Sequence, residues 1–341
     1  MSKTISHKEE WVSLIGEGGQ NYWVNKHKHP VFDAASVMVS GGSVLFSGPS
    51  GSGKSSASAV LCNPKNYPIL LHDTAYEAIH VCVRHVPIDM TKVITAQELY
   101  ATTTLQNGNT RVEPGVLGSF IADHGYPTQE ELMAFEADRT RVLRSGKGEV
   151  IIYAIIFDDL DRVVDSQTVN VTLKPTNDSE HVLPHDNCTR YLRCQAVATS
   201  NSTCARQNKY SGAAGLDPAQ ANRFTMFLVP HNPVSKILVK EYQSIGASTA
   251  QLETIEKFGL LIEEVSKEIN THGAFPDLGE VSIRQAKSIV KCYLYAKFDA
   301  ERAVDLLFAG LANEEDQEKA EVMKQRYFGN GPTKKRTGIL F

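Results

Sequence analysis

An eight-residue segment, GPSGSGKS from Gly48 to Ser55, constrains the fold of this chain more than any other part of the sequence. It matches the pattern G-x-x-x-x-G-K-[ST] at every position. The residues before it (SVLFS, 43–47) have the apolar character of a short buried strand, and the small residues after it (SSASAVL, 55–61) are compatible with a helix. A strand, a glycine loop and a helix in this order predict a phosphate-binding loop.

The chemistry of phosphate binding explains the spacing of this segment. Glycines let the backbone close into a ring whose N–H groups face phosphate oxygens, and the following helix presents its positive end to the same oxygens. Lys54 is expected to reach the β- and γ-phosphates of ATP, and the Ser55 hydroxyl is expected to bind Mg²⁺. The residues predicted to hold the nucleotide are Gly48, Pro49, Ser50, Gly51, Ser52, Gly53, Lys54, Ser55 and Ser56.

A metal bound to nucleotide needs an acidic ligand, which is expected at the end of a buried strand next to the loop. Residues 149–157 (EVIIYAIIF) are the most hydrophobic stretch of the chain and have the length and β-branched content of a buried parallel strand. Asp158 follows directly and is the predicted metal ligand, while Asp159 stands where a base would position the attacking water. The assignment within this acidic cluster stays open, because Asp161 can instead form an ion pair with Arg162.

Three polar residues further along the chain complete the predicted site. Asn201 follows the strand-like segment 192–199 and is expected to contact the γ-phosphate or its water, although an Asn in Ser-Asn-Ser is also typical of a turn. Arg223 precedes the strand-like segment 224–229 and is predicted to reach the phosphates of a neighbouring subunit; the alternative is a surface arginine. Arg284 starts a helix and is predicted to reach back to the nucleotide, unless it is only a solvated helix charge.

The order of the apolar segments predicts the fold class and the domains. Strands alternate with helices up to about residue 234, which predicts an α/β fold with a parallel sheet and flanking helices. The segments 251–270, 281–297 and 300–312 have helical spacing, which predicts a smaller all-helical lid domain. The expected domains are an N-terminal arm with a short helix (1–30), an α/β nucleotide-binding domain (31–234), a helical lid domain (235–330) and a flexible tail (331–341).

Local patterns predict three further elements of the α/β domain. Residues 33–39 are expected to form a short helix that ends before Gly41. Asn107-Gly108 lies between β-prone runs and predicts a β-hairpin. Residues 128–144 are charged and are expected to form an exposed helix.

The bulk composition narrows the function classes and the compartment. Hydrophobic residues make up 42 % and charged residues 22 % of the chain, which is ordinary for a soluble globular protein. The net charge of −4 provides no basic footprint for nucleic acid. The polar N-terminus lacks a signal-peptide core and no run of about 18 apolar residues exists, so no membrane association is expected. The six cysteines contain no C-x-x-C pair and are expected to be reduced thiols, which suits a cytoplasmic protein.

The order of these features is similar to that in the AAA+ ATPases. More narrowly, the chain resembles the MoxR branch and the ATPase subunit of the aerobic cobalt chelatase, in patches between residues 30 and 330. Segment 86–117 is similar to the helix-2 insert of that branch, and segment 210–224 is similar to the element that carries its conserved arginine. Residues 282–284 and 325–329 are similar to parts of its lid.

This resemblance implies roles and partners. It implies that Arg223 is an arginine finger, Asn201 the first sensor and Arg284 the second sensor. It also implies a homo-oligomer, namely a hexameric ring with ATP between subunits, that remodels or activates a protein substrate together with a partner carrying a von Willebrand A domain.

The chain departs from the family pattern in three places. The acidic pair is Asp158-Asp159 where the family usually has Asp-Glu, which implies slower activation of water. Residues 126–147 form an extra charged segment before the acidic strand. Residues 174–190 form a polar loop in which a pore-side hairpin is expected.

Two other function classes stay open. A nucleic-acid motor or helicase loader would share the same core, but it would need basic residues on the pore hairpin. Lys174 and Arg111 are the candidates there, and Glu113 opposes them. A P-loop protein that transfers phosphate to a small acceptor is the third class, and the helical C-terminal half gives it no support.

Overall fold

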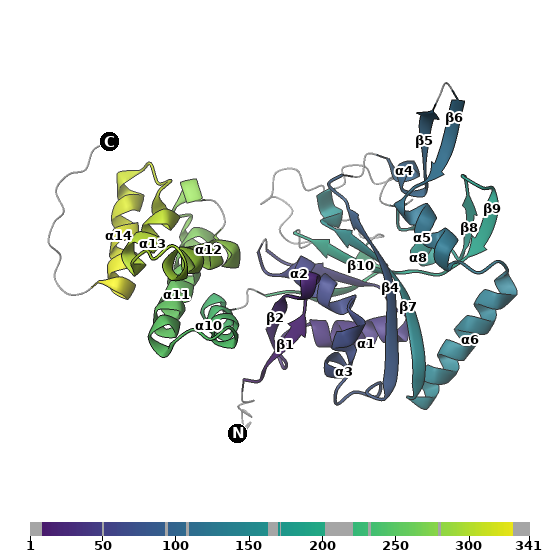
Figure 1. Ribbon diagram of the computed structural model, residues 1–341, viewed down its shortest axis with the longest axis horizontal. Helices are drawn as coiled ribbons and strands as arrows, with labels where there is room; N and C mark the ends of the chain where they lie inside the picture. The colour runs from purple at the N-terminus through teal and green to yellow at the C-terminus, as the bar shows by residue number, and fades with distance from the viewer. Residues whose placement is uncertain are drawn as a thin grey trace. The chain divides into compact units, whose positions relative to one another are not determined.

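The computed structural model describes residues 9–49, 51–92, 95–106, 109–162, 170, 172–201, 221–230, 233–278 and 281–329. The chain divides into two compact units (Figure 1). The first comprises Met1–Pro49 and Gly53–Pro230, and the second comprises Ser50–Ser52 and His231–Phe341. A parallel sheet organises the first unit, and helices make up the second.

A five-stranded parallel sheet forms the centre of the first unit. Its strands are β3 (Val44–Ser47), β4 (Ile79–Asp89), β7 (Gly148–Asp158), β10 (Gln195–Ser200) and β11 (Thr225–Leu228). Their order across the sheet is β11-β3-β10-β7-β4, and every neighbouring pair is parallel. The predicted α/β fold with a parallel sheet is therefore confirmed, and a helical region follows it in the chain.

Side chains on alternate faces of the sheet pack into two separate cores. In β3, Val44 and Phe46 belong to one core and Leu45 to the other. Helices α1 (Val31–Ser40), α2 (Lys54–Leu61) and α3 (Tyr67–Leu70) contribute to the first core, and α4 (Ala96–Tyr100) and α5 (Val116–His124) contribute to the second. Because both faces are covered, the strands β3 and β7 carry apolar residues in nearly continuous runs.

The carboxyl ends of the parallel strands meet at one edge of the sheet. Strand β3 leads into the glycine loop, β7 ends at Asp158, and β10 leads into Asn201. In open α/β sheets this edge is where ligands bind, because loops and helix N-termini gather there.

The extra charged segment before β7 is mainly one long helix, α6 (Gln129–Ser145). Thr128 and Glu131 form a capping box at its start, which satisfies the first free N–H groups. Farther along, Arg139 Nη2 donates to the carbonyl oxygens of Met38 (3.1 Å) and Val39 (3.0 Å) at the end of α1. The helix expected at 128–144 is confirmed, and it braces the end of α1.

The N-terminal arm differs from expectation. Instead of a short helix, β1 (Trp11–Ile15) and β2 (Asn21–Asn25) form an antiparallel hairpin, joined through the 3-10 turn η1 (Glu17–Gly19). Leu14 and Val24 are completely buried in the first core, and Val12 and Tyr22, each two positions away on the same strand, pack against that core. The side chain of Asn66 fixes the hairpin, because its Oδ1 accepts from the Ile15 N–H (2.8 Å) and its Nδ2 donates to the Ile15 carbonyl (2.9 Å).

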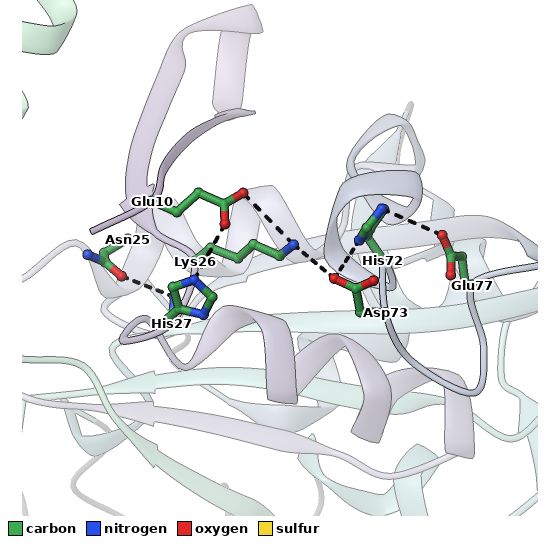
Figure 2. A network of polar contacts seen from close by, with 7 residues as sticks. All are labelled: Glu10, Asn25, Lys26, His27, His72, Asp73 and Glu77. Atoms are coloured by element: carbon green, nitrogen blue, oxygen red, sulfur yellow. Dashed lines mark hydrogen bonds and ion pairs between the residues drawn. The ribbon is translucent and has the colours of Figure 1, made fainter. Parts of the chain in front are cut away.

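A network of charged side chains also links this hairpin to the loop after α3 (Figure 2). Lys26 Nζ lies 3.9 Å from Glu10 and 3.2 Å from Asp73. His72 Nδ1 lies 2.8 Å from the same Asp73 carboxylate, and His27 lies 3.4 Å from Glu10. These groups are solvent-exposed to different degrees, so each pair contributes little, and the apolar contacts hold the hairpin.

Two smaller hairpins extend from the first unit (Figure 1). Strands β5 (Ala101–Gln106) and β6 (Asn109–Pro114) are antiparallel, which confirms the hairpin expected around Asn107-Gly108, although those two residues lie outside the described part. Strands β8 (Glu180–Leu183) and β9 (Cys188–Tyr191) form a second hairpin within the polar loop 174–190 and its end. Short elements complete the unit: η2 (Pro64–Asn66), η3 (Leu160–Arg162) and α8 (Lys174–Asn177).

The second unit is helical throughout residues 233–278 and 281–329. Its elements are α10 (Val234–Ser244), α11 (Thr249–His272), η4 (Pro276–Leu278), α12 (Ile283–Leu294), α13 (Ala300–Phe308) and α14 (Glu314–Phe328). Ser248, Ser282, Asp299 and Asn313 cap helices with side-chain oxygens. Phe258 and Phe275 are the largest fully buried side chains of its core. None of the helices in the described part of the chain is long and apolar enough to cross a bilayer.

Candidate functional site

The glycine loop adopts the backbone conformation that its sequence predicts. Gly51 has a φ of 72° and Gly53 a φ of 95°, both in the left-handed region that glycine enters without a steric penalty. Gly48 N–H donates to the carbonyl of Ser200 (3.3 Å), which attaches the start of the loop to β10. Of the other predicted loop residues, Pro49 and Ser52 are described, Ser56 is exposed in the first turn of α2, and Ser50 lies outside the described residues.

Lys54 is buried at the first position of α2, and its ammonium group contacts oxygens of the loop itself. It donates to the carbonyls of Gly48 (3.1 Å) and Pro49 (2.7 Å) and to Asn201 Oδ1 (2.8 Å). A buried ammonium is stable only when its donors are satisfied. These contacts hold the Lys54 ammonium against the backbone of the glycine loop and beside Asn201.

Ser55, Asp158 and Thr199 form a connected group at the carboxyl edge. Ser55 Oγ donates to Asp158 Oδ1 (2.8 Å), and Thr199 Oγ1 donates to the same carboxylate oxygen (2.7 Å). The two hydroxyls leave oxygen lone pairs available, and carboxylate and hydroxyl oxygens are ligands that Mg²⁺ accepts. Sequence reasoning missed Thr199, although it is the residue at which the strand-like segment 192–199 ends.

The strand order corrects one detail of the expected arrangement. The acidic strand β7 does not lie beside β3, because β10 lies between them. Asp158 still reaches Ser55, because Asp158 is the last residue of β7 and Ser55 lies in the first turn of α2, which follows the carboxyl end of β3. The intervening strand supplies Thr199 and Asn201, so it provides the connection between loop and acids rather than separating them.

Asp159 has a strained backbone and a perturbed carboxyl group. Its φ of 55° lies in the left-handed region, and its N–H donates to Thr199 Oγ1 (2.8 Å). Burial raises the pKa of the Asp159 carboxyl, and the negative charges of Asp158 and Asp161 raise it further. A hydrogen bond from Asn201 Nδ2 to Asp159 Oδ1 (2.9 Å) opposes that rise. Asp159 is thus a stronger base than an ordinary aspartate.

Asn201 is held by its backbone as well as its side chain. Its N–H donates to Asp161 Oδ2 (3.0 Å), and Asp161 is buried. The sequence left open whether Asp161 pairs with Arg162; in the structure it anchors Asn201.

Arg223 lies away from the glycine loop of its own chain. It precedes β11, whose first residue, Thr225, is in register with Val44 at the start of β3. The loop begins at the other end of β3, about 10 Å further along four strand residues. The Arg223 side chain is half-buried, and its Nη1 has no hydrogen-bond partner within the part of the chain that the structure describes.

Arg284 belongs to the second unit. It lies in the first turn of α12, where its N–H donates to the capping Ser282 Oγ (3.3 Å) and its side chain is exposed. The predicted contact of Arg284 with nucleotide stays a prediction.

Tyr22, paired with His29, forms a further contact with the glycine loop, and the sequence did not identify either residue. Tyr22 on β2 donates its hydroxyl to the Gly53 carbonyl (3.2 Å), and His29 Nε2 lies 3.1 Å from the same hydroxyl. His29 Nδ1 accepts from the Val31 N–H (3.3 Å). Burial lowers the pKa of His29 to about 4, so the imidazole is neutral at neutral pH.

Fold and site together define a parallel α/β protein with a glycine loop, a lysine and a hydroxyl–carboxylate pair at the carboxyl edge of its sheet. No family model matches the chain, and no curated protein matches it. Among solved structures, the chain is similar to a candidate ATPase from Cytophaga hutchinsonii, with 15 % identity and a TM-score of 0.37. The match covers 85 % of this chain and 78 % of that one. Because both measures are low, the functional proposal rests on the residues of the site itself.

Proposed function

We propose that this chain is a magnesium-dependent ATPase. The observation that carries the proposal is the contact between Ser55 Oγ and Asp158 Oδ1 at 2.8 Å, directly beside the buried Lys54. A hydroxyl and a carboxylate from two distant segments meet at the start of a helix whose free N–H groups suit phosphate. A nucleoside triphosphate with its metal fits this place, because a positive charge, the N-terminus of a helix and two oxygen ligands for a metal lie together there.

Binding of the triphosphate requires an exchange at Lys54. The contacts of its ammonium group include two carbonyl oxygens and one amide oxygen, which are neutral. Phosphate oxygens carry negative charge, so they add a Coulombic attraction to the Lys54 ammonium that neutral oxygens do not supply. The exchange is therefore favourable, and it frees the Asn201 amide oxygen.

The residues at the carboxyl edge also fit a magnesium ion. Ser55 and Asp158 would hold it, and both present oxygen atoms. The Ser55 proton points to Asp158, so a lone pair of the hydroxyl remains for the metal. When bound, Mg²⁺ would neutralise charge that develops on the phosphates.

Hydrolysis needs a base, and Asp159 meets that need. Its raised pKa strengthens it as a proton acceptor, and Asn201 Nδ2 orients its carboxylate. We assign Asp159 the positioning of the attacking water and Asn201 the orientation of that carboxylate.

We further propose that the active form is a ring, with six subunits, in which Arg223 completes the site of a neighbour. One observation supports this part: Arg223 precedes the amino end of β11, whereas the glycine loop of its own chain follows the carboxyl end of the neighbouring strand β3. Such an assembly would couple hydrolysis to remodelling of a protein substrate, with a von Willebrand A protein as a candidate partner. The helical second unit would then act as the lid, with Arg284 toward the nucleotide.

A nucleic-acid motor is the alternative, but the hairpin charges do not favour it. Arg111 on β6 lies 4.0 Å from Glu113, which offsets its charge. The net charge of the chain is −4, so the electrostatic field does not attract nucleic acid.

The experiment is an ATPase assay with binding measured in parallel, on the parent chain, Lys54→Ala and Asp159→Asn. We expect Mg²⁺-dependent turnover in the parent, loss of nucleotide binding in Lys54→Ala, and binding without turnover in Asp159→Asn. Absence of nucleotide binding by the parent would overturn the proposal. Stimulation by single-stranded or duplex DNA would favour the nucleic-acid motor, and full turnover by a monomer would exclude the ring.

A further inference from the structure

The N-terminal hairpin contacts the phosphate-binding loop at one backbone group. Tyr22 Oη donates to the carbonyl oxygen of Gly53 at 3.2 Å. The same carbonyl accepts from the Ala57 N–H (2.8 Å), the first hydrogen bond of helix α2. Both lone pairs of this oxygen are thus used, and the peptide between Gly53 and Lys54 is fixed in direction.

The direction of that peptide matters for phosphate binding. In a trans peptide the C=O and the N–H point in opposite directions. When Tyr22 and the helix hold the Gly53 carbonyl, the Lys54 N–H must point away from the helix, where the free donors at a helix start meet an anion. The same peptide also fixes the position of the Lys54 Cα, from which the side chain extends.

Packing shows that the contact is close as well as directional. A Cβ placed on Gly53 would lie 2.8 Å from Tyr22 Oη and 3.4 Å from Tyr22 Cε2. The hydroxyl therefore occupies the space that a side chain at position 53 would need, so glycine at this position allows the close approach of Tyr22.

His29 gives the Tyr22 hydroxyl a single orientation. Because His29 Nδ1 accepts from the Val31 N–H, the neutral ring carries its proton on Nε2. Nε2–H then donates to Tyr22 Oη, so the tyrosine proton is left for Gly53. The edge-on packing of the two rings, with centroids 5.6 Å apart, holds this arrangement.

We propose that Tyr22 and His29 are positioning residues for the phosphate-binding loop, acting in the order His29, Tyr22, Gly53 to orient the Lys54 N–H toward the nucleotide phosphates. This inference rests on the proposed nucleotide binding. It assigns the N-terminal hairpin a part in ligand affinity in addition to its packing on the core.

The test is a double-mutant cycle read out as the Kd for ATP with Mg²⁺. The four proteins are the parent, Tyr22→Phe, His29→Gln and the double variant, each in the full chain. Tyr22→Phe removes only the hydroxyl, and we expect a Kd about fivefold higher, the effect of losing one neutral hydrogen bond. His29→Gln alone should raise the Kd by a smaller factor, and in the Tyr22→Phe background it should have no further effect.

A melting temperature without nucleotide separates positioning from simple stabilisation. A purely structural role would lower the melting temperature of Tyr22→Phe while leaving the Kd of the folded protein at its parent value, and that result would overturn the inference. Additive effects of the two changes on the Kd would overturn the order of action. If the parent itself failed to bind ATP, the proposed function would fail instead, so the two failures are distinct.

Discussion

Asn201 joins Lys54 to Asp159 through the two ends of one side chain. Its amide oxygen accepts from Lys54 Nζ at 2.8 Å, and its amide nitrogen donates to Asp159 Oδ1 at 2.9 Å. The residue proposed to bind phosphate and the residue proposed to act on water therefore share one orienting group. If the proposed nucleotide binding draws Lys54 toward phosphate, Asn201 loses one of its two side-chain contacts, and the orientation of Asp159 changes in the same step.

Replacing Asn201 should separate binding from turnover. In Asn201→Ala, Lys54 keeps its two carbonyl contacts, whereas Asp159 loses the amide that orients it. We expect kcat to fall about 100-fold, the typical cost of removing one aligned polar group at a reacting centre, with a Kd for ATP changed less than about fivefold. Single-turnover hydrolysis with equilibrium binding checks this, and an equal loss in both quantities would contradict it.

Asp159→Asn should abolish turnover and stabilise the fold at neutral pH. The raised pKa means that the native state binds this proton more tightly than the unfolded state. The ionised carboxylate therefore destabilises the native state as pH rises above its unfolded pKa, and a neutral amide removes that effect. Asn also tolerates the left-handed backbone at φ 55°.

Melting curves from pH 3 to pH 8 measure this effect. At pH 7 the melting temperature of Asp159→Asn should be higher than that of the parent. The difference should vanish near pH 3, where the aspartate is protonated in the folded and the unfolded state. In the parent, kcat/KM should rise with pH through the raised pKa of Asp159 in the free protein, because the base must be ionised to accept a proton. A variant that melts below the parent at pH 7 would contradict the stated origin of the shift.

The sequence allowed the loop and its acid to be predicted because each depends on local pattern. Gly48 to Ser55 is a contiguous motif, and Asp158 ends an apolar strand that is visible in the chain. Thr199 was missed because its contact with Asp158 depends on the order of the strands in the sheet. Strand β10 lies between β3 and β7, and a local sequence pattern cannot predict that order. The contact of Tyr22 with Gly53 spans 31 residues, so it too arises only from tertiary packing.

Two elements could have been predicted from the sequence but were not. In β4, Ile79, Val81 and Val83 are buried and alternate with His80 and Arg84, which is the period of a half-covered strand. It is the outermost strand in the described sheet, where Pro87 is tolerated because edge strands leave N–H positions unused. In the hairpin β1–β2 the core-facing residues are spaced two apart (Val12 and Leu14, Tyr22 and Val24), but apolar residues also occupy other positions of these short strands, which favoured a helix and an arm.

The buried His29 should make stability depend on pH in mildly acidic solution. Its pKa is about 4 in the folded chain, against 6.5 for a free histidine. The unfolded state then binds more protons between these values, so stability is complete above pH 6.5 and is lost as pH falls toward 4. Over this pH range the free energy of unfolding should fall by about 3 kcal/mol because of His29.

Urea unfolding of the parent and His29→Gln between pH 4 and pH 7 tests this dependence. The variant has no titrating group at this position, so its free energy of unfolding should fall less steeply with acid. The exposed His27→Gln is the matched control, and its curve should follow the parent. Parallel curves for parent and His29→Gln would show that the imidazole is not the source.

Arg139 should contribute to stability and not to nucleotide binding. Its guanidinium donates to the carbonyls of Met38 and Val39 at the end of helix α1. The Met38 carbonyl also accepts from the Gly41 N–H and from Gln195 Nε2, so the Val39 carbonyl depends most on Arg139. Arg139→Met keeps the length of the side chain and removes the donors, and we expect a loss of about 2–3 kcal/mol. Arg141→Ala, on the exposed side of the same helix, should change stability by less than about 0.5 kcal/mol.

Gly53→Ala gives a second view of the contact with the N-terminal hairpin. Two costs act at this position: a φ of 95°, which an L-residue rarely adopts, and a Cβ that would lie 2.8 Å from Tyr22 Oη. Tyr22→Phe removes that oxygen, leaving Cε2 at 3.4 Å and Cζ at 3.6 Å, distances that a small shift of the ring accommodates. The cost of the backbone conformation does not depend on Tyr22, so Tyr22→Phe should restore only part of the stability that Gly53→Ala loses.

Free energies of unfolding for the two single variants and the double variant separate these costs. We expect Gly53→Ala to lose about 2–3 kcal/mol in the parent background and about 1 kcal/mol less in Tyr22→Phe. Equal losses in both backgrounds would mean that the hydroxyl does not limit the space beside Gly53. The same Tyr22 oxygen is proposed to hold the Gly53 carbonyl. A smaller loss of unfolding free energy from Gly53→Ala in the Tyr22→Phe background, together with weaker ATP binding by Tyr22→Phe, would therefore identify one contact as the origin of both effects.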